Sequence, residues 1–389
     1  MSVPKHDRLQ ADVRARLALA TATDADDWHL VSKARHALLL VLRQLEAGEV
    51  VTMPLTCLTA VAPVLSAGHQ PRYADLDPAT LALDPASVAG VISGSTRVVL
   101  AQHSFGAAAP LAEIRAAVGD DVLLVEDAAH CLGEMAVGDD GRPVADVSVH
   151  SFGVEKMLPT RMGGAIWLNP ATRGRPWRES LERELAELTG RGLRGRVSDR
   201  VSPLALKVGR RLGGPAGRAV DAAAGRGLVD AAIMPSERVG VVAGEPAALT
   251  GAALAAVARE LPGLAASQRH RRRIAAIYHE GLADLAGLTR PQVLDEPGRA
   301  LVRYPVLLGS SAQAEAVFDA LAAEGLVPGR WYRPLLFPGP SDPAPFAYRS
   351  GSCPAAEEVS ARILNLQTAP FVTEDAARRT VELIRAQVG

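Results

Sequence analysis

The stretch that decides the fold reads VLLVEDAAH at residues 122–130 and HSFGVEKMLPTRMGGA at residues 150–165. The first part is a short apolar run that ends on Asp127, which is typical of a buried strand with an acid at its end. Burial raises the pKa of such a carboxyl group unless a positive partner lies close by. In the second part, Ser151 and Lys156 lie five residues apart, after the next apolar run. An acid, a hydroxyl and an amine are therefore expected at the ends of neighbouring strands.

Apolar runs of strand length alternate with helix-like segments around this stretch. The alternation predicts an α/β fold in which helices cover both faces of a mostly parallel sheet. Ligands of such sheets bind beyond the carboxyl ends of the strands, so AQHSFG at 101–106 and VEDAAH at 125–130 are candidate site loops. The expected strands lie at 49–54, 71–77, 96–103, 122–130 and 163–169, and the expected helices at 33–46, 57–67, 86–92 and 110–118.

The 389 residues are enough for two domains of about 100–200 residues each. We expect a tail or helix over residues 1–30, a large domain over 31–250 and a smaller α+β domain over 251–389. The large domain carries an Arg-rich insert at about 171–230. This insert is interpreted as a solvated or subunit-facing surface or, alternatively, as a face that binds a phosphorylated substrate.

The composition is that of an ordinary globular protein, with 48% hydrophobic and 22% charged residues. The 42 basic and 43 acidic residues give a net charge of −1, which argues against a nucleic-acid partner. The three cysteines are too far apart for a disulfide framework or a metal cluster, so no metal and a reducing compartment are expected. Neither a signal peptide nor an apolar run of membrane-spanning length is apparent. These features predict a cytoplasmic protein without a membrane partner.

Asp127 and Lys156 together suit the chemistry of pyridoxal 5'-phosphate (PLP). A carboxylate that faces the pyridine nitrogen keeps the ring cationic, and a lysine forms a Schiff base with the aldehyde and moves a proton as a general base. Among Lys5, Lys33, Lys156 and Lys207, only Lys156 lies in a loop after a strand expected to neighbour the Asp127 strand. From the spacing alone, the alternative is that Asp127 caps a helix and that Lys156 is an ordinary surface lysine.

The longer pattern resembles the DegT/StrS family of sugar aminotransferases, which have the aspartate-aminotransferase-like PLP fold. The resemblance covers about 31–170 and 250–388. It rests on LLVEDAAHCLG at 123–133, DVSVHSFGVEKMLPTRMGGAIWLN at 146–169 and CPAAEEVSARILNLQTAPFVTEDAARRTVELI at 353–384.

The resemblance implies roles for five residues around the cofactor. Lys156 matches the Schiff-base lysine, Asp127 the partner of the ring nitrogen, and His130 the residue beside the ring hydroxyl. Ser151 matches a hydroxyl that binds the cofactor phosphate, and Thr56 lies near the family's threonine loop beside the ring.

The family's phosphate cradle is a small residue followed by Thr at a helix N-terminus, and it falls on Ala34 and Arg35. A helix N-terminus offers free amides to an anion, and Arg35 adds a positive charge. The alternative interpretation of Arg35 is a solvent-facing helix residue.

Three departures from the family pattern concern the ring, the phosphate and the substrate. The family's ring-facing aromatic residue is Cys57 or Leu58 here, so His103 becomes a candidate for that contact, the alternative being a structural histidine. The Asn that family members lend to the phosphate from the neighbouring subunit falls near Ala243, which cannot donate. Either Arg35 or a basic residue of the insert therefore substitutes for it, or the cofactor binds more weakly.

The third departure lies in the small domain, where the usual His-Tyr-x-Pro reads Trp331-Tyr332-Arg333-Pro334. This segment often borders substrate, so Tyr332 and Arg333 are candidate substrate residues. Arg333 either binds a carboxylate or phosphate in bidentate fashion or makes a structural salt bridge.

We therefore expect a PLP-dependent aminotransferase that moves an amino group from a donor such as glutamate to a ketone, on a sugar or cyclitol-like intermediate of a specialised pathway. The resemblance also implies a homodimer with a shared active site. Two alternatives stay open: elimination or replacement chemistry on a non-sugar substrate, and a cofactor-poor regulatory homologue. Retention of Lys156 speaks against the family's dehydratase branch, which has a histidine at this position.

Overall fold

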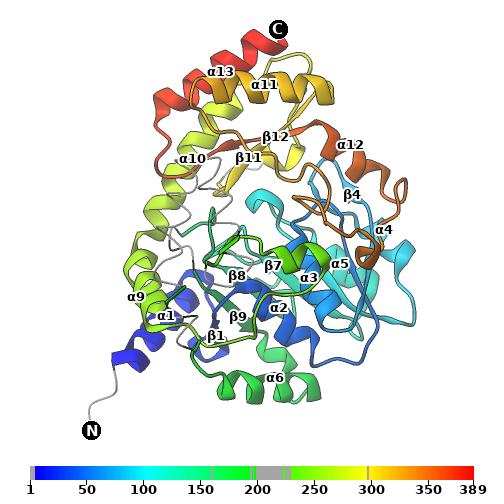
Figure 1. The fold of residues 1–389 in the computed structure, drawn as a ribbon, viewed down its shortest axis with the longest axis vertical. Helices are drawn as coiled ribbons and strands as arrows, with labels where there is room; N and C mark the ends of the chain where they lie inside the picture. Colours follow the sequence, from blue (N-terminus) through cyan, green and yellow to red (C-terminus); the bar gives the residue numbers. More distant parts are fainter. Residues whose placement is uncertain are drawn as a thin grey trace.

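The computed structural model describes residues 5–158, 160, 162–192, 195, 197–198, 222–223, 229–295 and 298–389. Lys207 and most of the predicted Arg-rich insert lie outside these ranges. In Figure 1, a large sheet with its helices fills the lower part of the molecule, and a smaller sheet with the C-terminal helices lies above it.

The central sheet has seven strands in the order β1-β9-β8-β7-β6-β2-β3. From β3 to β8 each strand is parallel to its neighbour, whereas β9 is antiparallel to both β8 and β1. The prediction of a mostly parallel sheet is confirmed. The strands are β1 (Trp28–Val31), β2 (Glu49–Thr52), β3 (Gln70–Tyr73), β6 (Thr96–Gln102), β7 (Leu123–Ala128), β8 (Val147–Ser151) and β9 (Gly164–Leu168).

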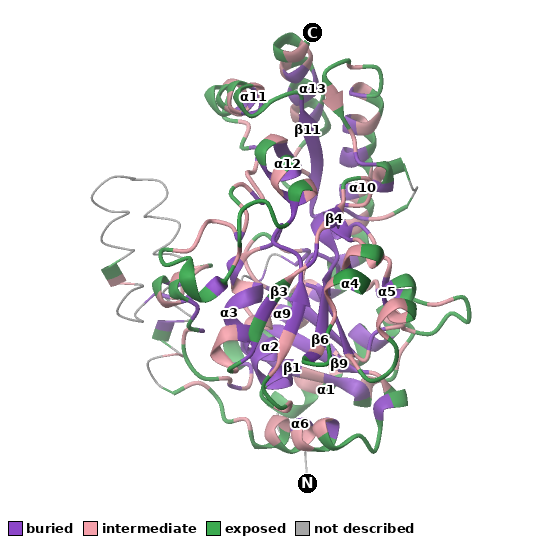
Figure 2. Ribbon diagram, turned by 90° about the vertical axis from the view of Figure 1, so that its right-hand side faces the viewer, coloured by how far each residue is buried: buried purple, intermediate pink, exposed green. Residues whose placement is uncertain are grey.

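Helices cover both faces of this sheet because successive strand residues point to opposite sides. Val98 packs with α2 (Ala34–Leu42), α3 (Leu58–Ser66) and α6 (Pro176–Glu187). Its neighbour Val99 packs on the other side with α4 (Pro85–Val91) and α5 (Leu111–Val118). The strands form the buried centre in Figure 2, and the helices around them show their exposed outer faces. The predicted two-sided arrangement is confirmed.

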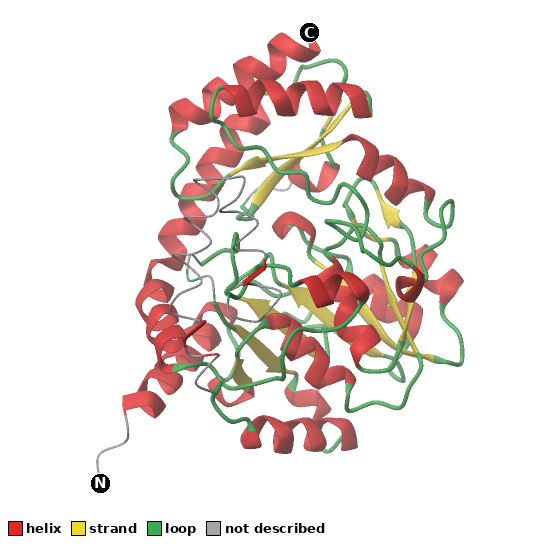
Figure 3. Cartoon of the chain, viewed as in Figure 1, coloured by secondary structure: helices red, strands yellow, loops and turns green. Residues whose placement is uncertain are grey.

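The smaller sheet is antiparallel, in the order β10-β11-β12. One face packs against three helices through a cluster that includes Tyr278, Val306, Val317, Leu364 and Ile384. The elements, visible at the top of Figure 3, are β10 (Leu288–Thr289), β11 (Arg303–Leu308), β12 (Ile363–Gln367), α10 (Leu264–Gly281), α11 (Ser311–Ala323) and α13 (Glu374–Val388).

A carboxylate joins this smaller unit to the larger one. Asp75 lies just before the hairpin of β4 (Leu76–Asp77) and β5 (Ala82–Leu83), and it accepts hydrogen bonds from the first amides of α12 (Pro354–Arg362). An acid at a helix N-terminus satisfies amides that have no partner within the helix.

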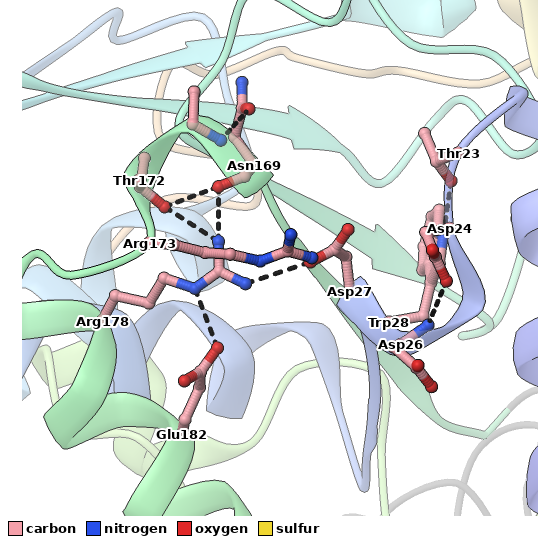
Figure 4. A network of polar contacts seen from close by, with 11 residues as sticks. Thr23, Asp24, Asp26, Asp27, Trp28, Asn169, Thr172, Arg173, Arg178 and Glu182 are labelled. Carbon is pink, nitrogen blue, oxygen red and sulfur yellow. Dashed lines mark hydrogen bonds and ion pairs between the residues drawn. The ribbon is translucent and has the colours of Figure 1, made fainter.

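The first thirty residues contribute to the large unit. Helix α1 (Lys5–Thr21) packs against α9 (Gly251–Glu260), and strand β1 joins the edge of the sheet. The buried Asp27 fixes the start of β1, because its carboxylate binds Arg173 and Arg178, each at 3.0 Å. Arg178 also donates to Thr172 and Glu182, so α6, β1 and the end of β9 share one polar network (Figure 4).

Candidate active site

The carboxyl ends of β1, β6, β7 and β8 meet at one edge of the sheet, and a cavity of about 500 Å³ opens there. Among the predicted site residues, those that line it are Ala34, Arg35, Asp127, His130, Ser151, Lys156 and Tyr332. The acid, the hydroxyl and the amine expected at neighbouring strand ends therefore lie around one space.

Asp127 is the last acid of β7 and is almost fully buried. Its Oδ1 accepts a hydrogen bond of 3.0 Å from the amide of Ala129. Burial raises the pKa of Asp127, and the amide of Ala129 and the positive charge of Lys156 oppose this rise. The carboxylate is thus placed in a site where a cationic partner would stabilise it.

Lys156 lies in the loop after β8, with Nζ 5.6 Å from the ring centre of Trp331. Burial lowers the pKa of Lys156, and Asp127 opposes this only in part. Arg271 of α10 donates to the carbonyl of Lys156 at 3.3 Å, and this contact helps to hold the loop.

His130, Trp331 and Tyr332 form an aromatic wall of the cavity. The rings of His130 and Trp331 stack with their centres 5.1 Å apart, and His130 Nε2 lies 3.2 Å from the hydroxyl of Tyr332. Nδ1 accepts from the amide of Phe105, which places the ring proton on Nε2. Burial lowers the pKa of His130 well below its ordinary value, so the imidazole is neutral.

The N-terminus of α2 lies beside Ser151 because two strands bring it there. Ser151 pairs with Gly164 of β9, and a Cβ on Gly164 would lie 2.6 Å from the backbone nitrogen of Ala34. Lys33, the N-cap of α2, pairs with Gly163 in an isolated bridge. A hydroxyl and the first amides of a helix therefore face the same part of the cavity, as an anion-binding site requires.

Charged side chains line the cavity next to this helix end. Lys33 Nζ lies 2.5 Å from Asp230 Oδ1, and Arg191 Nη1 lies 3.0 Å from Asp230 Oδ2. Arg35 pairs with the fully buried carboxylate of Glu237. No local pattern in the sequence connects Arg191, Asp230 or Glu237 to the start of α2, so none of them was a predicted site residue.

Other predicted residues lie outside the cavity lining. Thr56 is buried and donates to Gln102, which does line the cavity. His103 is buried and binds Glu126 at 2.6 Å. Arg333 forms an ion pair of 2.8 Å with Glu315.

The positions that depart from the family pattern also have defined places. Cys57 lines the cavity, whereas Leu58 is buried in an apolar cluster. Trp331 is the aromatic residue beside Lys156, whereas His103 was the predicted candidate for contact with the ring in place of the aromatic residue missing at Cys57 or Leu58. Ala243 contributes its carbonyl oxygen, which lies 3.1 Å from His36 Nε2. Of the helices in the described ranges, none is long and apolar enough to cross a membrane.

Parts of the sequence are similar to known aminotransferases. Over 143 residues the chain is 32% identical to the L-glutamine:2-deoxy-scyllo-inosose aminotransferase of Streptoalloteichus tenebrarius, covering 36% of this chain and 34% of that protein. Over 125 residues it is 35% identical to the L-glutamine:scyllo-inosose aminotransferase of Streptomyces griseus, covering 31% and 29%. The matched region thus spans about a third of the length of these relatives.

The fold has a close counterpart in the crystal structure of NtdA from Bacillus subtilis with the bound cofactor PMP. That structure matches with a TM-score of 0.71 at 16% identity, over 99% of this chain and 78% of that one. The model of the DegT/DnrJ/EryC1/StrS aminotransferase family matches residues 18–173 and 236–385. The predicted resemblance is confirmed, and the chain belongs to this family.

Proposed function

We propose that the protein is a PLP-dependent aminotransferase that moves the amino group of glutamine or glutamate onto the ketone of a cyclitol or sugar intermediate. The family and the two inosose aminotransferases support this reaction class. Asp127 lies near the end of β7, and Lys156 lies in the loop after the neighbouring strand β8. The observation that carries the proposal is that both line one cavity.

The cavity residues fit PLP in three respects. Lys156 offers an amine that lines the cavity, and Asp127 offers a buried carboxylate. Ser151 and the start of α2 suit an anion. Gly164 allows the start of α2 to lie against the strand that pairs with Ser151, since a Cβ on Gly164 would collide with Ala34.

PLP, when bound, supplies an aldehyde that takes up the amino group and a ring that delocalises the electrons released at the donor's Cα. In our proposal Lys156 would bond the aldehyde carbon, Asp127 would hold the proton of the ring nitrogen, and neutral His130 would lie on the side of the ring hydroxyl. Ser151 and the first amides of α2 bind the phosphate.

Lys156 is also the proposed carrier of the proton. Because burial lowers its pKa, a larger fraction of the amine is neutral near pH 7 than for an exposed lysine, as a general base requires. Once the donor's amine has displaced it from the aldehyde carbon, Nζ would take the proton from the donor's Cα and later deliver it during transfer to the ketone. Trp331 and Tyr332 give the cavity an apolar wall against which a sugar or cyclitol ring can pack.

We further propose a cytoplasmic homodimer with a shared site, as the family resemblance implies. The free thiols Cys57, Cys131 and Cys353 fit a reducing compartment. Sedimentation of the PLP-loaded protein should give twice the 40.8 kDa of one chain, and a single-chain mass at micromolar concentration would contradict the dimer.

The test is the visible absorbance of the purified protein with PLP, before and after addition of glutamine or glutamate. Wild type and a Lys5→Ala control should give a visible band that a donor converts to that of the amine form of the cofactor, and Lys156→Ala should not. A band that neither donor changes would favour elimination or replacement chemistry. Absence of a band in wild type would show that the proposed function is wrong.

A further inference from the structure

The polar cluster at the start of α2 consists of Lys33, Arg35, Arg191, Asp230 and Glu237, and all but Glu237 line the cavity. Among the described residues, its three cations lie beside two carboxylates. Burial alone would raise the pKa of Asp230, but Lys33 and Arg191 hold it below its ordinary value, so this carboxylate is ionised.

Arg35 and Glu237 form the structural half of the cluster. Arg35 donates through Nη1 to both carboxylate oxygens of Glu237 and through Nη2 to the carbonyl of Ala232. Glu237 is fully buried and also accepts from the amide of Met234 at 2.7 Å. These contacts fasten the segment around residues 230–239 to α2, and they direct the guanidinium of Arg35 to that segment.

Lys33 and Arg191 form the other half of the cluster. Each binds a different oxygen of the Asp230 carboxylate. Two cations that hold two oxygens of an anion in this way resemble the environment of a bound phosphate. An ammonium has three N–H donors, and Lys33 directs one of them to Asp230. Lys33 can therefore keep this contact and still donate to a second anion in the cavity.

The backbone of Lys33 lies beside the proposed phosphate site, and its side chain lines the same cavity. Lys33 pairs with Gly163, and the next residue, Gly164, pairs with Ser151 and touches the backbone of Ala34. The ammonium thus belongs to the residue that begins the helix whose first amides face the anion.

We propose that Lys33 and Arg191 bind the phosphate of the cofactor, with Asp230 as their resting counter-ion, in place of the side-chain hydroxyl that the family pattern carries at the position of Arg35. This inference rests on the proposed function, since it concerns the same cofactor. It assigns the phosphate contact of this chain to charged groups, whereas Arg35 is a positioning residue for the cavity wall.

The test compares equilibrium binding of PLP with that of pyridoxal, which lacks the phosphate, without any turnover. Lys33→Met and Arg191→Gln should each weaken PLP binding about tenfold or more, as expected for loss of a charge-assisted contact. Both variants should change pyridoxal binding less than about twofold, because pyridoxal has no group for these cations. Arg43→Gln is the control, since Arg43 lies at the other end of α2 in an exposed ion pair with Glu245.

Two further measurements separate the possible failures. In wild type, inorganic phosphate should displace PLP but not pyridoxal, and Asp230→Asn should strengthen PLP binding by removing a competing anion. Equal weakening of PLP and pyridoxal in the Lys33 and Arg191 variants, or wild-type PLP that binds no tighter than pyridoxal, would overturn the inference and leave the proposed function intact. Failure of both ligands to bind wild type would overturn both.

Discussion

Burial favours the neutral form of the acid and of the two bases that line the cavity. It raises the pKa of Asp127 and lowers those of Lys156 and His130. A cationic ring beside Asp127 would stabilise its carboxylate. A carbonyl carbon beside Lys156 would bond to its neutral amine. The chemistry of the cofactor and the cost of burying these side chains point to the same arrangement.

His36 provides a residue-scale prediction about acid sensitivity. It is buried in α2, with Nδ1 2.7 Å from Ser32 Oγ and Nε2 3.1 Å from the carbonyl of Ala243. Burial lowers the pKa of His36 to about 3. In the unfolded chain the imidazole takes up its proton near pH 6.5, so between these values the unfolded state binds one more proton and stability falls as the pH drops.

From pH 7.5 to pH 5.0 this proton should cost wild type about 2 kcal/mol of unfolding free energy. His36→Gln removes the titrating group and should lose about 2 kcal/mol less than wild type over the same interval. Urea unfolding of both proteins at the two pH values measures the difference. An equal loss in both would mean that His36 is already charged in the folded protein.

The sequence predicts the residues on the strand ends better than it predicts their partners. Asp127 and Ser151 stand at the ends of apolar runs, and the topology of a parallel sheet brings such ends together. Asp230 and Trp331 come from loops distant in the sequence, and only the folded chain places them beside Lys33 and Lys156. Loop residues lack the periodicity on which a prediction depends.

At the scale of elements, the close approach of β9 and α2 gives the second prediction. Gly164→Ala puts a Cβ 2.6 Å from the nitrogen of Ala34 and should cost about 1–3 kcal/mol of stability, as overpacking does. It should also weaken PLP binding, because it displaces the first amides of α2. Gly90→Ala in α4 is the matched control, with nothing within 4 Å of its Cβ, and should not destabilise. Urea unfolding and PLP titration of both variants decide the matter.

The network of Figure 4 gives the third prediction, about how β1 and α6 are joined. Arg178→Met leaves Asp27 with a mostly exposed partner and should cost about 3–5 kcal/mol, as removal of one member of a buried ion pair does. The control is Arg173→Met: this guanidinium binds the same oxygen but is 62% exposed, so the cost should stay below about 1 kcal/mol. Thermal or urea unfolding that gives equal losses would contradict this division.

The elements themselves were predictable where the periodicity is long and local. Helices α2 and α3 lie where the spacing of apolar residues predicts them, as does strand β6. Strand β1 (Trp28–Val31) was not predicted, because four residues carry little pattern and their pairing with β9 bridges more than a hundred positions. Most of the Arg-rich insert lies outside the described residues, and its role stays a prediction.

At the scale of the whole molecule, binding of PLP should stabilise both units together. The cavity is lined by Asp127 of the large sheet and by Tyr332 and Phe337 of the segment between α11 and α12. It is also lined by the loop of Lys156, to which Arg271 of α10 donates a hydrogen bond. PLP at a hundredfold excess over its Kd should add about 2.7 kcal/mol to the unfolding free energy. Calorimetry should show a single transition that shifts upward with PLP. Two transitions of which only one shifts would mean that the units unfold independently.

The walls of the cavity have a consequence for the biosynthesis of the protein. They are built from positions between Ser32 and Phe337, so no fragment that ends before Phe337 can assemble the complete site. A nascent chain on the ribosome must therefore release Phe337 before the site exists. The finished cavity is thus a late product of folding, and its occupancy distinguishes chains that have completed folding from those that have not.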